Sequence, residues 1–102
     1  MKRTEILDAA KRCVCGDREQ DYGSPENNFQ TIADLWTAYL KSACVSPDVD
    51  LCILAKDVAA MLALLKIARI GSGHAKEDNW IDLAGYAACG GEIETGTVEV
   101  EL

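Results

Sequence analysis

Hydrophobic side chains recur along this chain at the spacing of three and four residues that is typical of amphipathic helices. The clearest run begins at Ser24 and Pro25, where a good N-cap residue precedes a residue suited to the first helical position. Seven apolar residues then form one stripe over four turns: Phe29, Ile32, Ala33, Trp36, Tyr39, Leu40 and Ala43. This pattern predicts a long helix with one face packed on a core.

Two more segments, about residues 4–14 and about residues 77–92, show the same periodicity. A polar connector, residues 17–23, follows the first of them. The second carries three glycines, which indicate either close helix packing or a frayed end. Residues 95–102 alternate between apolar and polar side chains, so a short strand and a disordered acidic tail both stay open.

The stretch from Val58 to Leu65 is apolar on all sides, within a helix that we predict over residues 57–70. Such a helix is buried by its own bundle or by a partner subunit. We therefore expect it to be the most buried element, with Met61, Leu62 and Leu65 in the core. For residues 46–54 an early helix start and an extended linker are both open.

Four helices joined by short links predict an all-α fold, a bundle of four main helices. We expect a single helical domain over residues 1–94 and a C-terminal tail over residues 95–102. A chain of 102 residues has too few residues outside this helix to bury its apolar surface on all sides, so we expect a homodimer or a higher oligomer.

The net charge of −7 disfavours a protein that coats DNA or RNA, because an acidic surface repels the phosphate backbone. No apolar run approaches the ~20 residues needed to cross a bilayer, and we recognise no signal peptide, so we expect a cytoplasmic protein. We expect the five cysteines to be reduced and mostly buried. Cys13 and Cys15 lie two apart on a predicted helix, which makes a poor zinc chelate.

Two pairs of charged residues stand out as candidates for chemistry. Asp78 and Asp82 lie four apart, so their carboxylates share one helix face and can hold Mg²⁺; the alternative is a solvated face. Lys66 and Arg69 lie three apart on an otherwise apolar helix and need an anion, either a phosphate or a structural acid. A direct ion pair of Asp82 with Lys66 or Arg69 would satisfy both pairs without any ligand.

The polar connector can cradle a base and a phosphate, or it is a solvated turn. The nucleotide-binding candidates that we name there and nearby are Arg18, Glu19, Asp21, Tyr22, Asn28 and Asp57. Glu19, Asp21 or Asp57 would complete the metal shell. We interpret His74, the single histidine, as a surface residue.

Several blocks in order resemble a family of small phage and prophage proteins whose function is not established. They are Arg18–Gly23, Asn28-Phe29, the stripe from Ile32 to Leu40, Asp57–Met61, Leu65–Arg69 and Asp78–Cys89. The resemblance covers roughly residues 10–93 and implies a phage protein in the cytoplasm of a bacterial host.

A weaker resemblance is to the MazG-like all-α nucleotide pyrophosphohydrolases. It lies in the Tyr22-Gly23 loop and in the Asp-x3-Asp-Leu-Ala-x-Tyr-Ala block that starts at Asp78. In those families, acids on helices bind Mg²⁺, and the metal binds a nucleoside triphosphate. Asp78 and Asp82 match acids of that late helix. The usual Glu-x-x-Glu pair on an earlier helix is not visible, since that helix offers Glu26, Asn28 and Asp34 instead.

Two functions are therefore predicted as alternatives. In the first, the chain is a Mg²⁺-dependent pyrophosphohydrolase of (deoxy)nucleoside triphosphates. Asp78 and Asp82 would then bind the metal, and Lys66 and Arg69 would act as catalytic residues that stabilise the phosphate charge. In the second, it is a non-catalytic phage accessory module that binds a nucleotide or a host protein through the same face.

Overall fold

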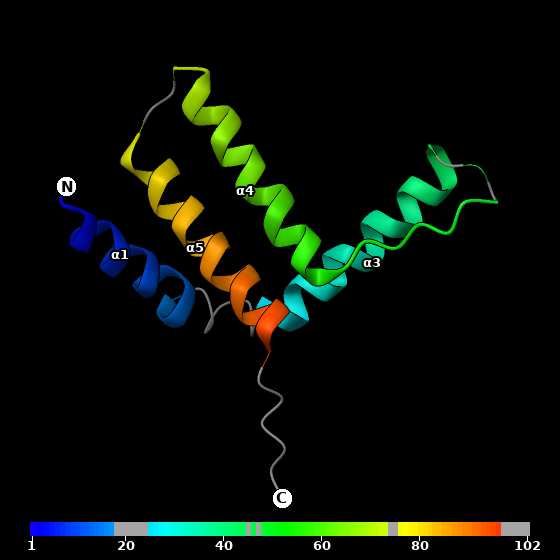
Figure 1. Ribbon diagram of the computed structural model, residues 1–102, viewed down its shortest axis with the longest axis horizontal. Helices are drawn as coiled ribbons and strands as arrows, with labels where there is room; N and C mark the ends of the chain where they lie inside the picture. The colour runs from blue at the N-terminus through cyan, green and yellow to red at the C-terminus, as the bar shows by residue number, and fades with distance from the viewer. Residues whose placement is uncertain (18–24, 45, 47, 74–75, 97–102) are drawn as a thin grey trace, which may run out of the picture.

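The structure is a computed structural model, and it describes residues 1–17, 25–44, 46, 48–73 and 76–96. Within these ranges the chain is all-α, with four α-helices and no strand, as the sequence predicts (Figure 1). A π-helical turn, η1 (Cys13–Asp17), continues the first helix. The helices are α1 (Arg3–Arg12), α3 (Pro25–Ala43), α4 (Ala55–Gly71) and α5 (Glu77–Thr95).

Helices α4 and α5 form an antiparallel hairpin that is the centre of the fold (Figure 1). Small side chains allow the two helices to approach closely, because an added Cβ on Gly90 would lie 3.0 Å from the Cβ of Ala59. The first half of α3 packs against this hairpin through its buried residues. The buried core contains Phe29 and Ala33 from α3, Ala55, Val58 and Ala59 from α4, and Cys89 from α5.

Helix α1 runs parallel to α5 along its other side (Figure 1). The amino group of Met1 lies 4.0 Å from the Glu77 carboxylate, at the start of both helices. Further along, Val14 lies so close to Gly85 that an added Cβ there would be 3.0 Å from its Cγ1 atom. α1, α5 and α4 are thus neighbours in that order.

The segment between α3 and α4 turns back along α3 as an extended linker, which resolves the alternative left open by the sequence. Thr37 fixes it in place. The backbone N–H of Ile53 donates to Thr37 Oγ1 at 2.9 Å, and that hydroxyl donates to the Ile53 carbonyl at 3.4 Å. α4 then begins with a cap in which the Leu54 N–H donates to the Asp57 carboxylate at 2.9 Å.

The prediction that Met61 and Leu65 lie in the core is wrong for the single chain. Met61 is 42% exposed and Leu65 is 51% exposed, whereas Leu62 is half-buried. The reason is the arrangement of the helices: α5 covers one side of α4 and α3 covers only its first turns. The prediction of mostly buried cysteines is also wrong, because only Cys89 is buried and the other four are exposed; all five are free thiols.

Among the described residues, no helix combines the length and the apolar character that a membrane span requires.

Candidate functional site

A pocket of about 460 Å³ lies between α1 and the first turns of α5. Its wall carries both acids predicted from the sequence, together with a cation from the neighbouring helix. The residues that line it are Ala9, Arg12, Cys13, Asp78, Ile81 and Asp82. Two carboxylates and a guanidinium therefore meet at one concave surface.

The helical spacing of Asp78 and Asp82 explains why both reach the same pocket, since residues four apart lie on one face. Ile81 is buried, so the acids lie at the edge of the contact between α1 and α5. Asp78 is in the first turn of α5, where the helix dipole favours negative charge. Arg12 in the last turn of α1 adds a positive charge. Both features reduce the repulsion between the two acids.

Asp82 is also bound by a lysine from α4. The Nζ atom of Lys66 lies 2.8 Å from Asp82 Oδ2, and the two side chains are 12% and 35% exposed. The ion pair that the sequence offered as an alternative to a ligand is thus present. It does not fill the site, because Asp82 still lines the pocket and Asp78 makes no ion pair among the described residues.

The structure does not gather all the predicted site residues. Asp57 caps the start of α4, where the neighbouring Lys56 is paired with Glu94 of α5 at 3.2 Å. Asp78 precedes Glu94 by 16 residues, or about 24 Å along a helix, so Asp57 is at the far end of the hairpin from the two acids. It cannot complete their metal shell within this chain.

The remaining candidates lie elsewhere or outside the described residues. Arg69 is exposed in the last turn of α4 and does not line the pocket. Asn28 is half-buried near the start of α3. The candidates that fall on residues which the structure does not describe are Arg18, Glu19, Asp21, Tyr22 and His74.

The donor set at the pocket fits a magnesium ion that is shared with a ligand. Within the described part of the chain, no group of three or more His, Cys, Asp or Glu side chains is placed to hold a metal. Mg²⁺, however, usually binds one or two carboxylates and takes its other ligands from phosphates and water. Asp78 and Asp82, which both line the pocket, supply these one or two carboxylates.

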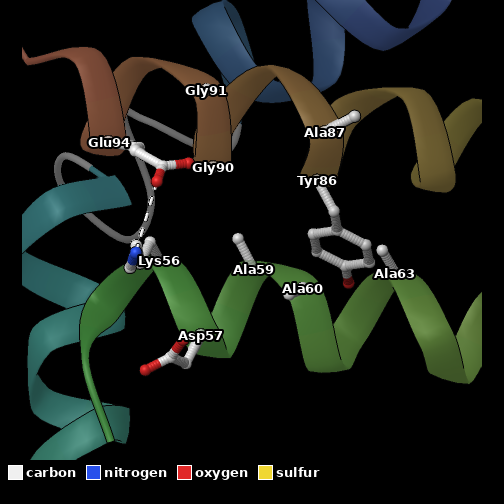
Figure 2. Close-up of a pocket in the computed structure, with 10 residues that line it drawn as sticks. All are labelled: Lys56, Asp57, Ala59, Ala60, Ala63, Tyr86, Ala87, Gly90, Gly91 and Glu94. Carbon is white, nitrogen blue, oxygen red and sulfur yellow. Dashed lines mark hydrogen bonds and ion pairs between the residues drawn. The ribbon is translucent and has the colours of Figure 1, made fainter.

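A second pocket of about 320 Å³ lies between α4 and α5 (Figure 2). The ring of Tyr86 extends from α5 toward Ala60 and Ala63 of α4, and the Lys56–Glu94 ion pair closes one end. Asp57 points away from α5 (Figure 2). The charges here satisfy each other, and alanines and glycines form most of the wall, so we assign the candidate site to the pocket between α1 and α5.

Sequence reasoning missed Arg12 and Cys13 in the candidate site. Both are exposed residues at the end of α1, and a base there is ordinarily explained by the helix dipole. They reach Asp78 and Asp82 only because α1 lies parallel to α5, which no local pattern predicts. The one available signal was the periodicity of residues 4–14, which places Ala9, Arg12 and Cys13 on neighbouring positions of one face.

The chain is thus a small all-α protein with an acidic pocket. Sequence comparison identifies its family. Residues 5–94 match the family described as a domain of unknown function, DUF6378. The chain belongs to this family.

Two curated relatives are phage proteins, both called Gene 55 protein. That of Mycobacterium phage L5 is 40% identical over 82 residues, which cover 80% of this chain and 47% of the relative. That of Mycobacterium phage D29 is 39% identical over 97 residues, which cover 94% of this chain and 58% of the relative. The chain therefore spans about half the length of these relatives. No solved structure matches it.

These matches confirm the resemblance to a phage family of unestablished function. They give no support to the resemblance to the MazG-like hydrolases, which stays a prediction.

Proposed function

We propose that this phage-family protein binds a phosphorylated nucleotide together with Mg²⁺ in the pocket between α1 and α5. The observation that supports the proposal is the presence of Asp78, Asp82 and Arg12 on the wall of one pocket. Carboxylate oxygens are the ligands that Mg²⁺ prefers, and a guanidinium binds phosphate through paired N–H donors. The site thus offers partners for both the metal and the phosphate.

Each charged residue has a distinct role in this proposal. Asp78 and Asp82 hold the metal, which would neutralise phosphate charge and polarise a phosphoryl oxygen. Arg12 contacts a phosphate directly. Lys66 orients Asp82 through the 2.8 Å ion pair rather than acting on the phosphate itself. Arg69 does not line the pocket and has no role in this proposal.

The binding test compares two acids on the helices that form the pocket. We expect Asp78→Asn to weaken Mg²⁺-dependent binding of a deoxynucleoside triphosphate by about 10- to 100-fold, the cost of losing one charged contact. Asp8→Asn is the matched control, because Asp8 is exposed on α1 and does not line the pocket. Isothermal titration calorimetry with a panel of nucleoside triphosphates, with and without Mg²⁺, gives the affinities. Unchanged Mg²⁺-dependent affinity in Asp78→Asn would show that the site lies elsewhere.

Hydrolysis is a separate question, because it requires more than binding. Pyrophosphate release from the same nucleotides, assayed with Mg²⁺ or Mn²⁺, would assign the protein as a nucleotide pyrophosphohydrolase if Asp78→Asn abolishes it. Binding without release would favour the second candidate, a phage accessory module. The observation that favours this second candidate is the small number of acids at the pocket.

A further inference from the structure

The three helices α1, α5 and α4 lie side by side in a single layer (Figure 1). Helix α5 contacts both α1 and α4, which have no extensive contact with each other. Because a helix can bury its apolar residues only against another element, stable domains have at least two packed layers. Over much of this layer, the described residues of the single chain provide no second layer.

The outer face of α4 shows where a second layer is needed. We define this face by its exposed apolar residues, Met61, Leu64, Leu65, Ile67 and Ala68. Helical spacing places Leu64 opposite the buried residues Ala55 and Ala59, and Leu64 is 62% exposed. No charged residue interrupts the helix between Val58 and Leu65. Monomeric proteins rarely expose a contiguous apolar surface of this kind.

A second exposed apolar surface belongs to an arm that projects from the layer (Figure 1). The arm consists of the second half of α3 and the linker residues 48–54, which Thr37 joins to each other. Its exposed apolar residues include Leu35 at 64%, Tyr39 at 69% and Val49 at 52%. The two segments of the arm are thus joined at Thr37, and the arm carries apolar side chains that are exposed in the single chain.

We propose that a second copy of this chain packs on the outer face of α4 and is held by the arm. Each large side chain on these two surfaces offers on the order of 100 Å² for burial. Together they approach the ~800 Å² per partner that a stable interface requires. An isologous dimer would bring the same surface from both copies together and so supply the missing second layer to each.

The charge of the chain is consistent with a second copy on this surface. The chain carries a net charge of −7, so two copies repel each other wherever their acidic surfaces meet. Beyond Asp57 in its first turn, the outer face of α4 carries no charged side chain as far as Ala68, so two copies can approach there without that repulsion. The nucleotide pocket faces α1 instead, so this dimer is independent of the proposed function.

The oligomeric state of matched variants tests the proposal. Light scattering after gel filtration should give about 22 kDa for the unaltered protein at micromolar concentration, twice the chain mass of 11.0 kDa. We expect Leu64→Glu to give the mass of one chain, because it places a charge in the centre of the contact. Leu7→Glu is the control and should stay dimeric: Leu7 is 61% exposed, nearly the same as Leu64, but it lies on α1.

Two further readouts separate loss of the interface from loss of the fold. Leu64 is exposed in the single chain, so circular dichroism of Leu64→Glu should retain a helical spectrum. The Tm of the unaltered protein should rise with protein concentration, whereas that of Leu64→Glu should not. A mass near 11 kDa for the unaltered protein, or dissociation by Leu7→Glu but not by Leu64→Glu, would overturn the proposal.

Discussion

The ion pair between Lys66 and Asp82 joins the two central helices beside the candidate site. The Lys66 side chain is 12% exposed, and its ammonium group has Asp82 as its charged partner. Removing one member of such a pair leaves the other desolvated and unpaired. Solvent partly screens this effect, because Asp82 is 35% exposed.

We expect Asp82→Ala to lower the free energy of unfolding by about 1–2 kcal/mol for that reason. Lys66→Met replaces the ammonium with an apolar group of similar length and should be less harmful. In the double variant no charge is left unpaired, so the two losses should not add. Urea unfolding of the two single variants and the double variant measures this coupling. Additive losses would show that the 2.8 Å contact contributes nothing to stability.

For single residues, the sequence predicts that Asp78 and Asp82 lie together, but it does not predict which residues lie around them. The position of Asp78 and Asp82 on one face follows from helical geometry. The pairing of Asp82 with a base of the preceding helix is only one of two alternatives that the sequence leaves open, and the structure shows it. Arg12 could not be predicted as their neighbour, because it is 66 residues before Asp78 in the chain and its position depends on how α1 packs. Long-range packing is not encoded in any local spacing.

Within helix α5, neighbouring glycines have different surroundings. Gly90 faces α4, where an added Cβ would lie 3.0 Å from the Cβ of Ala59. Gly91 has open space within 4 Å of the same position. The close approach of α4 and α5 thus depends on one of these glycines and not on the other.

We expect Gly91→Ala to raise the free energy of unfolding by ~0.5–1 kcal/mol, because alanine is the better helix former. Gly90→Ala has the same gain in propensity but forces the two helices apart, and overpacking of this kind costs ~1–3 kcal/mol. It should therefore be net destabilising. Urea unfolding of both variants at one protein concentration provides the comparison. Equal stabilisation by both substitutions would mean that α4 can move away from α5 at no cost.

The helices themselves are largely predictable, and their ends less so. Pro25 indicates the start of α3 correctly, since the preference of proline for the first helical position is a local feature. The end of α5 was expected near Glu92, but the helix continues to Thr95. Its last turn is held by contacts from elsewhere in the structure, among them the ion pair of Glu94 with Lys56. The linker before α4 depends in the same way on Thr37.

For the whole molecule, the all-α fold follows from periodicity, but the arrangement of the helices does not. Apolar residues on all sides of α4 predict a helix that is covered all round, whereas one face of α4 is exposed in the single chain. They do not indicate which side α5 covers, or that α3 leaves the layer as an arm. Met61 and Leu65 were for this reason assigned to a core that the single chain does not enclose.

The order of the helices along the chain bears on how the molecule folds. Only a few residues separate α4 from α5, whereas α1 must close a loop of more than 60 residues to reach α5. Loop-closure entropy makes the longer connection more costly by about 2 kcal/mol. We expect amide hydrogen exchange to be slowest in the hairpin of α4 and α5 and faster in α1. Equal protection in α1 would mean that the three helices form one cooperative unit.

The parallel packing of α1 on α5 has a consequence for synthesis on the ribosome. Helix α1 packs on α5, so it is made well before the helix on which it docks. At ~5–20 residues per second, α1 waits several seconds for α5 to emerge. During that interval its apolar stripe is accessible to chaperones or to other nascent chains.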